Sequence, residues 1–164
     1  MVFQTQRLEI IPLNLPFLRL LANNMREFES KLNCKYQAEP ICGFFAQYVD
    51  MQINVVANNP DDYLFNTFWV IIEKESRIVV GTAAFKGNPD KNGEIEIGYG
   101  LGKKHEHKGY MTEAVAEMCR WAMSQENVKH VIAETDVDGY ASQKILERNG
   151  FVRYRFGDSS WWRL

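Results

Sequence analysis

Cysteine is scarce in this sequence. The 164 residues include three cysteines, Cys34, Cys42 and Cys119, which are odd in number and show no CxxC spacing. A disulfide framework or a zinc site needs more cysteines, or more closely spaced ones. We therefore expect free thiols that pack as small apolar residues in a reducing compartment.

Long hydrophobic runs are also missing. The most apolar stretch, residues 41–57, is interrupted by polar residues such as Asp50, whereas a transmembrane helix needs about 20 consecutive apolar residues. Residues 1–14 do not show the basic and then apolar pattern of a secretory signal. These absences predict a cytoplasmic protein without a membrane partner.

Neither sign of charge dominates. The chain has 19 Lys and Arg residues and 21 Asp and Glu residues, a formal net charge of −2. A general nucleic-acid binder is expected to carry a large basic excess. We therefore expect no direct nucleic-acid partner, and an RNA-interaction domain that uses residues 103–108 is the least favoured function.

What the sequence does contain is an ordinary globular composition. Apolar residues make up 46% and charged residues 24% of the 164 residues, enough to bury a sizeable core in one domain. No repeat, linker or low-complexity segment divides the chain, so we expect residues 1–164 to form a single domain.

Hydrophobic periodicity predicts an α+β fold. Four helices are expected, over residues 16–24, 41–56, 112–123 and 141–148, and the second is expected to begin near Pro40 with Phe44 on its apolar stripe. Seven strands are expected, over residues 7–11, 68–72, 78–85, 94–101, 130–135, 151–156 and 159–164. The second and third of these strands read as a hairpin, and the last two as another around Gly157 and Asp158.

The segment between the strand at 94–101 and the helix at 112–123 has the most distinctive chemistry. The strand alternates, with Glu94 and Glu96 on one face, and the two glycines near its end suggest a bulge or a close backbone approach. A basic loop, KKHEHKG, follows and ends at Gly109 just before the helix. Backbone amides at a helix start and nearby positive charge suit a phosphate, although a solvated basic turn would read the same way.

Several motifs, in the order EIGY (96–99), KGYMTEA (108–114) and ASQKILERNGF (141–151), resemble the GNAT acetyltransferase superfamily. The closest branch is that of the ribosomal-protein N-terminal acetyltransferases (RimJ/RimL-type), which the motifs TQRL (5–8) and GTAAF (81–85) also resemble. The resemblance implies a mixed, mostly antiparallel central sheet of about seven strands flanked by about four helices. It also implies an N-acetyltransferase that needs no metal, in which a primary amine, on a peptide N-terminus or a small molecule, attacks acetyl-CoA directly in a ternary complex. A homodimer is left open.

The same resemblance implies which residues hold acetyl-CoA. The family's Gln/Arg-x-x-Gly-x-Gly/Ala motif falls on six residues of this chain, among which the glycine matches and the first and last positions depart: Glu106, His107, Lys108, Gly109, Tyr110 and Met111. Beside them, the backbone of Tyr99, Gly100 and Leu101 would pair with the pantetheine arm, and the Thr112 hydroxyl would contact a phosphate. The branch also has an Asn-x-Ala-Ser element. Ser142 matches its last position, and the glycine that follows Asp138 stands in place of its Asn.

Acid–base chemistry is needed as well, because an alkyl amine with a pKa of about 10 is mostly protonated at neutral pH. Glu96 is the first candidate for the base and Glu94 the second, although either carboxylate could simply solvate a strand face. Ser142 is a further catalytic candidate, which would contact the sulfur or arm of the cofactor or equally cap the start of its helix, with Tyr140 an outside candidate for the proton donor. The usual tyrosine of the family is replaced by Leu146, so a CoA-binding regulatory module without turnover is the alternative.

Overall fold

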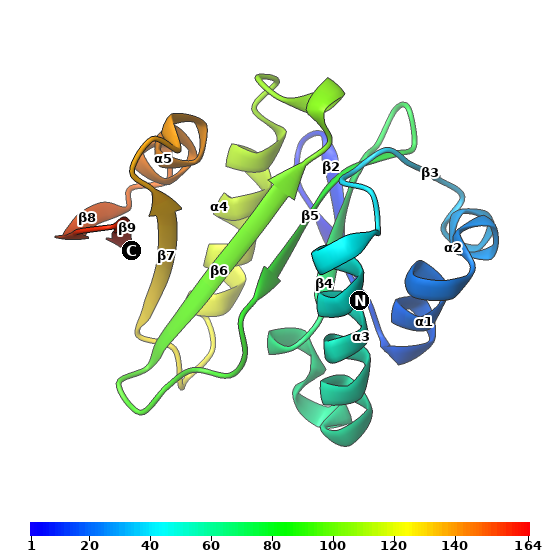
Figure 1. Ribbon diagram of the computed structural model, residues 1–164, viewed down its shortest axis with the longest axis horizontal. Helices are drawn as coiled ribbons and strands as arrows, with labels where there is room; N and C mark the ends of the chain where they lie inside the picture. The colour runs from blue at the N-terminus through cyan, green and yellow to red at the C-terminus, as the bar shows by residue number, and fades with distance from the viewer.

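The computed structural model describes residues 1–164 as a twisted sheet with helices on both faces (Figure 1). The strands are β1 (Phe3–Gln4), β2 (Leu8–Pro12), β3 (Lys35–Tyr36), β4 (Phe68–Glu73), β5 (Ile78–Phe85), β6 (Glu94–Leu101), β7 (His130–Asp136), β8 (Val152–Phe156) and β9 (Ser159–Arg163). The α-helices are α1 (Leu15–Asn23), α2 (Met25–Leu32), α3 (Gly43–Asn58), α4 (Tyr110–Met123) and α5 (Tyr140–Arg148). Two 3₁₀-helices, η1 (Pro60–Phe65) and η2 (Lys103–His105), complete the chain. None of the helices combines the length and the apolar character that crossing a membrane requires.

The strands lie in the order β1-β2-β4-β5-β6-β7-β9-β8, and β3 pairs with β5. Neighbouring strands are antiparallel except for the pairs β6–β7 and β3–β5, which are parallel. This is the mixed, mostly antiparallel α+β sheet that the sequence predicted. The expected hairpin of β4 and β5 is confirmed, and almost every residue of the two strands is buried because helices cover both faces.

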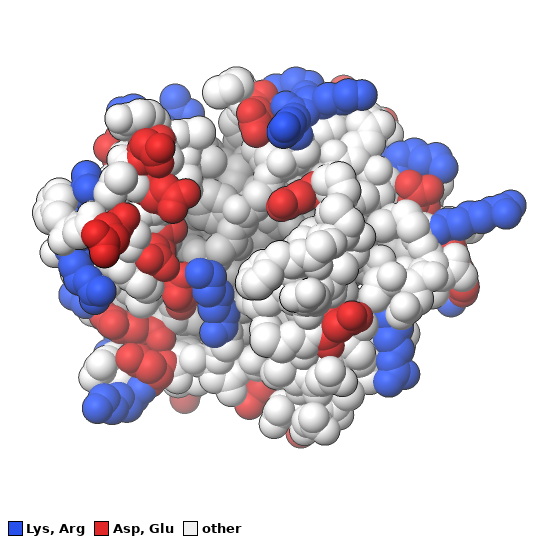
Figure 2. Space-filling view, in the orientation of Figure 1, with Lys and Arg blue, Asp and Glu red and all other residues white.

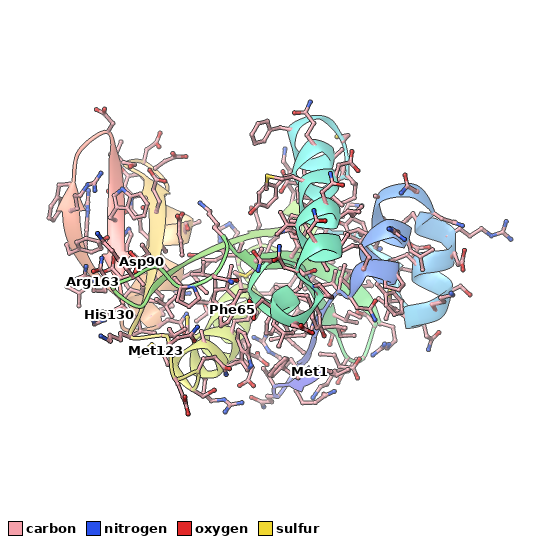
Figure 3. The ribbon with its side chains drawn as sticks, turned by 90° about the horizontal axis from the view of Figure 1, so that it is seen from below. Met1, Phe65, Asp90, Met123, His130 and Arg163 are labelled. Atoms are coloured by element: carbon pink, nitrogen blue, oxygen red, sulfur yellow. The ribbon has the colours of Figure 1, made fainter.

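The two faces of the sheet are covered by different helices. Figure 3 shows α3 on one side of the sheet and α4 on the other. The core under α4 contains Trp69, Phe85 and Trp121, whose rings contact one another. The core on the opposite face joins α1, α2 and α3 to the sheet, and Phe28 and Val49 are fully buried there. Packing on both faces therefore fixes β4, β5 and β6 relative to α4.

The structure differs from the sequence prediction mainly in the first third of the chain. The sheet has nine strands where seven were expected, and the two additional ones are the two-residue strands β1 and β3. Helix α2 is likewise a fifth α-helix where four were expected. The side chain of Asn24 accepts a hydrogen bond from Glu27 N at 3.2 Å, which separates α2 from α1. Helix α3 begins at Gly43, so Pro40 lies in a loop, and Phe44 is 85% exposed because it falls off the apolar stripe.

Candidate active site

The site begins where β6 and β7 separate. The two strands pair from Glu94 opposite His130 to Glu96 opposite Ile132, and no pairing with β7 continues beyond. On its other edge, β6 pairs with β5 without interruption through Leu101. The second half of β6 therefore presents one edge without a strand partner, which leaves the backbone of Tyr99 to Leu101 free for the pairing that the resemblance implied.

The bulge suggested by the two glycines of β6 is absent, since the register with β5 has no shift. The glycines instead leave the strand surface bare. A Cβ atom on Gly98 would lie 3.3 Å from Cε of Lys86, and one on Gly100 would lie 3.4 Å from Oε2 of Glu39. Close approach of side chains from other segments explains these glycines better than a bulge does.

The loop between β6 and α4 combines left-handed residues with an uncapped helix start. His107 and Gly109 both adopt positive φ angles, of 61° and 79°, and no side chain caps the start of α4. Left-handed residues in such a loop turn successive amides toward a common point, and the first amides of a helix lack intrahelical partners. Lys103, Lys104 and Lys108 are exposed around the loop. These features fit the phosphates that the sequence analysis expected here.

An N-terminal segment clamps this loop, which sequence reasoning did not foresee. Arg7 donates from Nε to Oε2 of Glu113 at 2.7 Å and from Nη1 to the carbonyl oxygen of Lys108 at 2.8 Å. Thr5 Oγ1 donates to Glu113 Oε1 at 2.6 Å. Burial acts to raise the pKa of Glu113, but the hydrogen bonds from Thr5 and Arg7 outweigh it and hold that pKa below its ordinary value. The TQRL motif thus connects β2 to the first turn of α4.

His105 has a structural place in the same region. Its side chain is buried, and Nε2 lies 3.1 Å from Oε1 of Gln37. Burial, together with the charges of Lys108 and Lys104, lowers the pKa of His105 below its ordinary value. The neutral imidazole therefore links the loop to the segment that follows β3, while His107 is exposed.

A groove of about 420 Å³ runs from the open edge of β6 to the starts of α4 and α5. Nine of the residues expected to bind the cofactor line it: Tyr99, Gly100, Leu101, Glu106, His107, Gly109, Met111, Thr112 and Ser142. Lys108, Tyr110 and Asp138 do not line the groove. The Lys108 carbonyl accepts from Arg7, the Tyr110 ring lies 4.9 Å below the Arg7 guanidinium, and the Asp138 carbonyl accepts from Tyr140 N at 2.8 Å.

The two departures from the family motif are accommodated differently. The Met111 side chain is buried in the core under α4, with 1% of its surface exposed. Glu106 is exposed, and its Oε2 lies 4.0 Å from Nε2 of His107. Lys144 and Arg148 of α5 also line the groove. The sequence pattern does not single out either residue, because both have the spacing of ordinary solvent-facing helix residues.

Tyr99 and Ser142 form a hydroxyl pair in this groove. Ser142 Oγ lies 3.0 Å from the Tyr99 hydroxyl, which in turn donates to the Ser142 carbonyl oxygen at 3.2 Å. Burial raises the pKa of Tyr99 to about 12, although the hydrogen bond with Ser142 acts in the opposite direction. Tyr99 is therefore protonated at neutral pH. The candidate donor Tyr140 lines the same groove but is 70% exposed.

The candidate carboxylates of β6 both occur in ion pairs. Glu96 pairs with Lys86 of the β5–β6 loop, and Glu94 pairs with Arg163 of β9. Each carboxyl side chain is 19% exposed, and neither lines the groove. Both lie on the face turned away from α4, and Figure 2 shows acidic side chains gathered along the flank of a hollow on that side.

A second, smaller pocket opens on this face of β6. It has a volume of about 200 Å³ and is lined by Gly98, Tyr99 and Gly100 together with aromatic side chains of α3 and β4. Phe45 and Tyr48 both meet the Phe68 ring edge-on, with centroids 5.1 and 5.4 Å away. The groove and this pocket share Tyr99 and Gly100, so they approach the same residues of β6.

None of the three cysteines lines the groove or the second pocket, and Cys42 is exposed because it lies just before α3, so only Cys34 and Cys119 pack as expected. Cys119 is buried on α4, and burial raises the pKa of its thiol to about 12. Burial likewise raises the pKa of the Cys34 thiol to about 11. Neither thiol forms a nucleophilic thiolate at neutral pH.

Comparison with known proteins gives a consistent result. The family model described as an acetyltransferase (GNAT) domain matches residues 22–152. The chain is 32% identical over 152 residues to a protein of Bacillus subtilis (strain 168) named uncharacterized N-acetyltransferase YjdG, covering 92% of this chain and 89% of that protein.

Solved structures show the same fold. The ribosomal-protein-S5-alanine acetyltransferase from Vibrio fischeri superposes with a TM-score of 0.71 at 18% identity, covering 100% of this chain and 96% of that one. RimL, a ribosomal L7/L12 alpha-N-protein acetyltransferase solved in complex with coenzyme A, superposes with a TM-score of 0.70 at 16% identity, covering 100% and 97%. At these identities the likeness concerns the fold.

Proposed function

The chain belongs to the acetyltransferase (GNAT) domain family, and on that premise we propose that it transfers the acetyl group of acetyl-CoA to the nitrogen of a primary amine. The observation that carries the proposal is the meeting of the groove and the second pocket at Tyr99 and Gly100. Such an arrangement brings two substrates together from opposite sides of one strand, as direct transfer in a ternary complex requires.

The groove suits the cofactor in both chemistry and shape. The amides around Gly109 and the start of α4 would hold the pyrophosphate, with Thr112 beside them. The unpaired edge of β6, from Tyr99 to Leu101, would bind the pantetheine arm as an added strand binds. Acetyl-CoA supplies the activated acetyl thioester, and the protein supplies its position.

Proton transfers complete the proposed reaction. The uncharged amine nitrogen attacks the thioester carbonyl carbon, the C–N bond forms, and the C–S bond breaks. The ammonium loses one proton to a base before attack, the nitrogen loses a second proton as the C–N bond forms, and the leaving sulfur gains one. The Tyr99–Ser142 hydroxyl pair can donate the proton to sulfur and recover the one that leaves the nitrogen, because it lines the groove and Tyr99 is protonated at neutral pH.

The first base candidate, Glu96, stays a prediction. Its Oε1 accepts a hydrogen bond from Lys86, and uptake of a proton from the substrate or a water would weaken that ion pair. Lys86 lines the second pocket, whereas Glu96 itself does not. Glu94, held by Arg163 of β9, lies farther along β6 from Gly98 and is the weaker candidate.

Release of free thiol from acetyl-CoA with a panel of amines tests the function. The panel should include short peptides with free N-termini, since RimL is named for acting on a protein α-amino group, as well as free amino acids and small alkyl and aryl amines. We expect turnover with at least one acceptor, and we expect Glu96→Gln to lower kcat. Measurable CoA binding without turnover on any amine would favour a regulatory module instead, and full activity of Glu96→Gln across neutral pH would exclude Glu96 as the base.

Two further expectations stay predictions. The sheet runs without a break from β1 to β8, which supports a single domain over residues 1–164. A cytoplasmic location is the remaining expectation from the sequence.

A further inference from the structure

A short segment after β3 crosses the end of β6. Gln37 N donates to the Val79 carbonyl of β5 at 3.0 Å, which extends the pairing of β3 by one residue. A Cβ atom on Gly102 would lie 2.0 Å from the Gln37 carbonyl oxygen, so the two backbones are in direct contact. With the contact from His105 to Gln37, these interactions fix the segment against the sheet.

The same segment presents Glu39 to the site. The Tyr36 hydroxyl donates to the Glu39 carbonyl oxygen at 2.7 Å, and burial holds the pKa of Tyr36 above its ordinary value, so the donor stays protonated. The Glu39 carboxylate then reaches over β6, with Oε2 3.4 Å from where a Cβ of Gly100 would stand.

Glu39 is the one carboxylate that lines the second pocket. It also lines an open hollow on the outer side of the segment, and Gly100 is common to that hollow, the second pocket and the groove. Unlike Glu96 and Glu94, its carboxylate has no hydrogen bond or ion pair within the chain. Glu39 is exposed to solvent, so an incoming cation reaches its carboxylate without displacing a partner from the protein, and the apolar pocket lies beside it.

We propose that Glu39 binds the ammonium group of the acceptor and that the second pocket takes an apolar group next to that ammonium. This inference rests on the proposed function and deepens it by naming the acceptor class. The pocket volume of about 200 Å³ is smaller than the roughly 300–1,000 Å³ of typical ligand pockets, so it admits a group of about one side chain. Phe45, Tyr48 and Phe68 favour an apolar or aromatic group there.

The acceptor is therefore a primary amine flanked by an apolar group and without a carboxylate nearby. An arylalkylamine and a peptide that begins with a large apolar residue share this chemistry. A free amino acid differs, because its own carboxylate would approach Glu39 and be repelled. The charged groups around Glu39 are Lys86 in the pocket and Lys103, Lys104 and Glu106 on the outer side.

Steady-state kinetics with four acceptors test this inference: phenethylamine, a Phe-Ala-Ala tripeptide, a Gly-Ala-Ala tripeptide and free phenylalanine. We expect the first two to have kcat/KM values on the order of tenfold or more above the last two. In Glu39→Gln we expect the KM for the best acceptor to rise on the order of 10- to 100-fold, while the KM for acetyl-CoA changes less than about twofold. A better result with the tripeptide than with phenethylamine identifies a peptide N-terminus as the source of the amine, and the reverse identifies a small molecule.

Two further variants complete the test, a control for charge and a change in the pocket wall. Glu126→Gln removes an exposed carboxylate outside the site and should leave every constant unchanged. Phe45→Ala should raise the KM for phenethylamine more than that for Gly-Ala-Ala. Equal KM values for the acceptor in Glu39→Gln and wild type, or equal kcat/KM for all four acceptors, would overturn the inference while leaving acetyl transfer intact.

Direct binding separates this inference from the proposed function. Calorimetric titration of phenethylamine into the protein saturated with CoA needs no turnover. We expect binding by wild type and Glu126→Gln and weakening on the order of tenfold or more in Glu39→Gln. Absence of turnover together with this binding pattern would refute the transferase proposal but not the Glu39 site, whereas equal binding by all three proteins would refute the Glu39 site alone.

Discussion

The Arg7–Glu113 pair gives the sharpest prediction for the cofactor groove. Arg7 donates hydrogen bonds to the Lys108 carbonyl oxygen at 2.8 Å and to the Glu113 carboxylate at 2.7 Å. Lys108 directly precedes the left-handed Gly109 in the loop between β6 and α4. Replacing Arg7 with Ala frees this loop, and CoA must then order it again on binding. Fixing the backbone of one residue costs about 1–2 kcal/mol, so we expect the Kd for CoA to rise about 5- to 30-fold.

Loss of the Arg7 charge would also weaken the binding of an anion, and a second variant separates the two causes. Glu113→Ala also breaks the Arg7–Glu113 contact, but it deletes a negative charge near the proposed phosphate site. If the clamp matters, this variant also binds CoA more weakly, whereas electrostatics alone would make it bind more tightly. Calorimetric titration with CoA measures both.

Arg77→Ala is the matched control. Arg77 pairs with Glu9 of β2 and donates to the Leu32 and Asn33 carbonyl oxygens, and it does not line the groove. We expect urea unfolding to show a loss of about 1–2 kcal/mol for this variant and for Arg7→Ala, since both lose partly exposed charged hydrogen bonds. The clamp is refuted if Arg7→Ala binds CoA as tightly as Arg77→Ala, or if Glu113→Ala binds it more tightly than wild type.

Three more predictions concern the groove and its supports. Tyr99→Phe should lower kcat at least about tenfold with little change in the Kd for CoA, if the hydroxyl pair protonates the leaving sulfur; an unchanged kcat would remove Tyr99 from that role. Gly102→Ala should destabilise the protein by about 1–3 kcal/mol in urea unfolding, because a Cβ there would overlap the Gln37 carbonyl, and an unchanged midpoint would contradict that contact. Because the pKa of His105 is lowered in the folded state, its contribution to stability is complete above its unfolded pKa of about 6.5 and is lost as the pH falls through the folded value. Unfolding measured between pH 7.5 and 5.5 should therefore show a smaller pH dependence in His105→Gln than in wild type, and equal slopes would contradict the assignment.

Much of the fold could be predicted because local patterns and tertiary structure agree in the second half of the chain. The residues of β5 and β6 alternate or cluster as buried strands do, and the predicted limits 78–85 and 94–101 are those of the structure. Asn149 and Gly150 end α5 as expected, with Gly150 at a φ of 83°. In the first half, α2 was missed because α1 and α2 are separated by the single residue Asn24, although Asn24 and Glu27 together form a recognisable capping pair.

The residues of the candidate site also differ in how far the sequence alone could predict them. Residues near one another in sequence, such as Gly109 and Thr112, were named because a loop before a helix has a local signature. Glu39 was not named, because its position depends on the parallel pairing of the two-residue strand β3 with β5. A contact of that kind leaves no periodic pattern in the sequence.

The ion pairs of β6 bear on which glutamate can act at the site. A carboxylate already paired with a cation attracts an incoming ammonium less strongly, because the bound cation offsets much of its charge. Glu96 meets this obstacle with Lys86, and Glu94 meets it with Arg163. Glu39 meets no such obstacle, so it is the better first contact for the ammonium. In Lys86→Met the acceptor KM should therefore change less than in Glu39→Gln, and the opposite ranking would reverse the order of the two carboxylates.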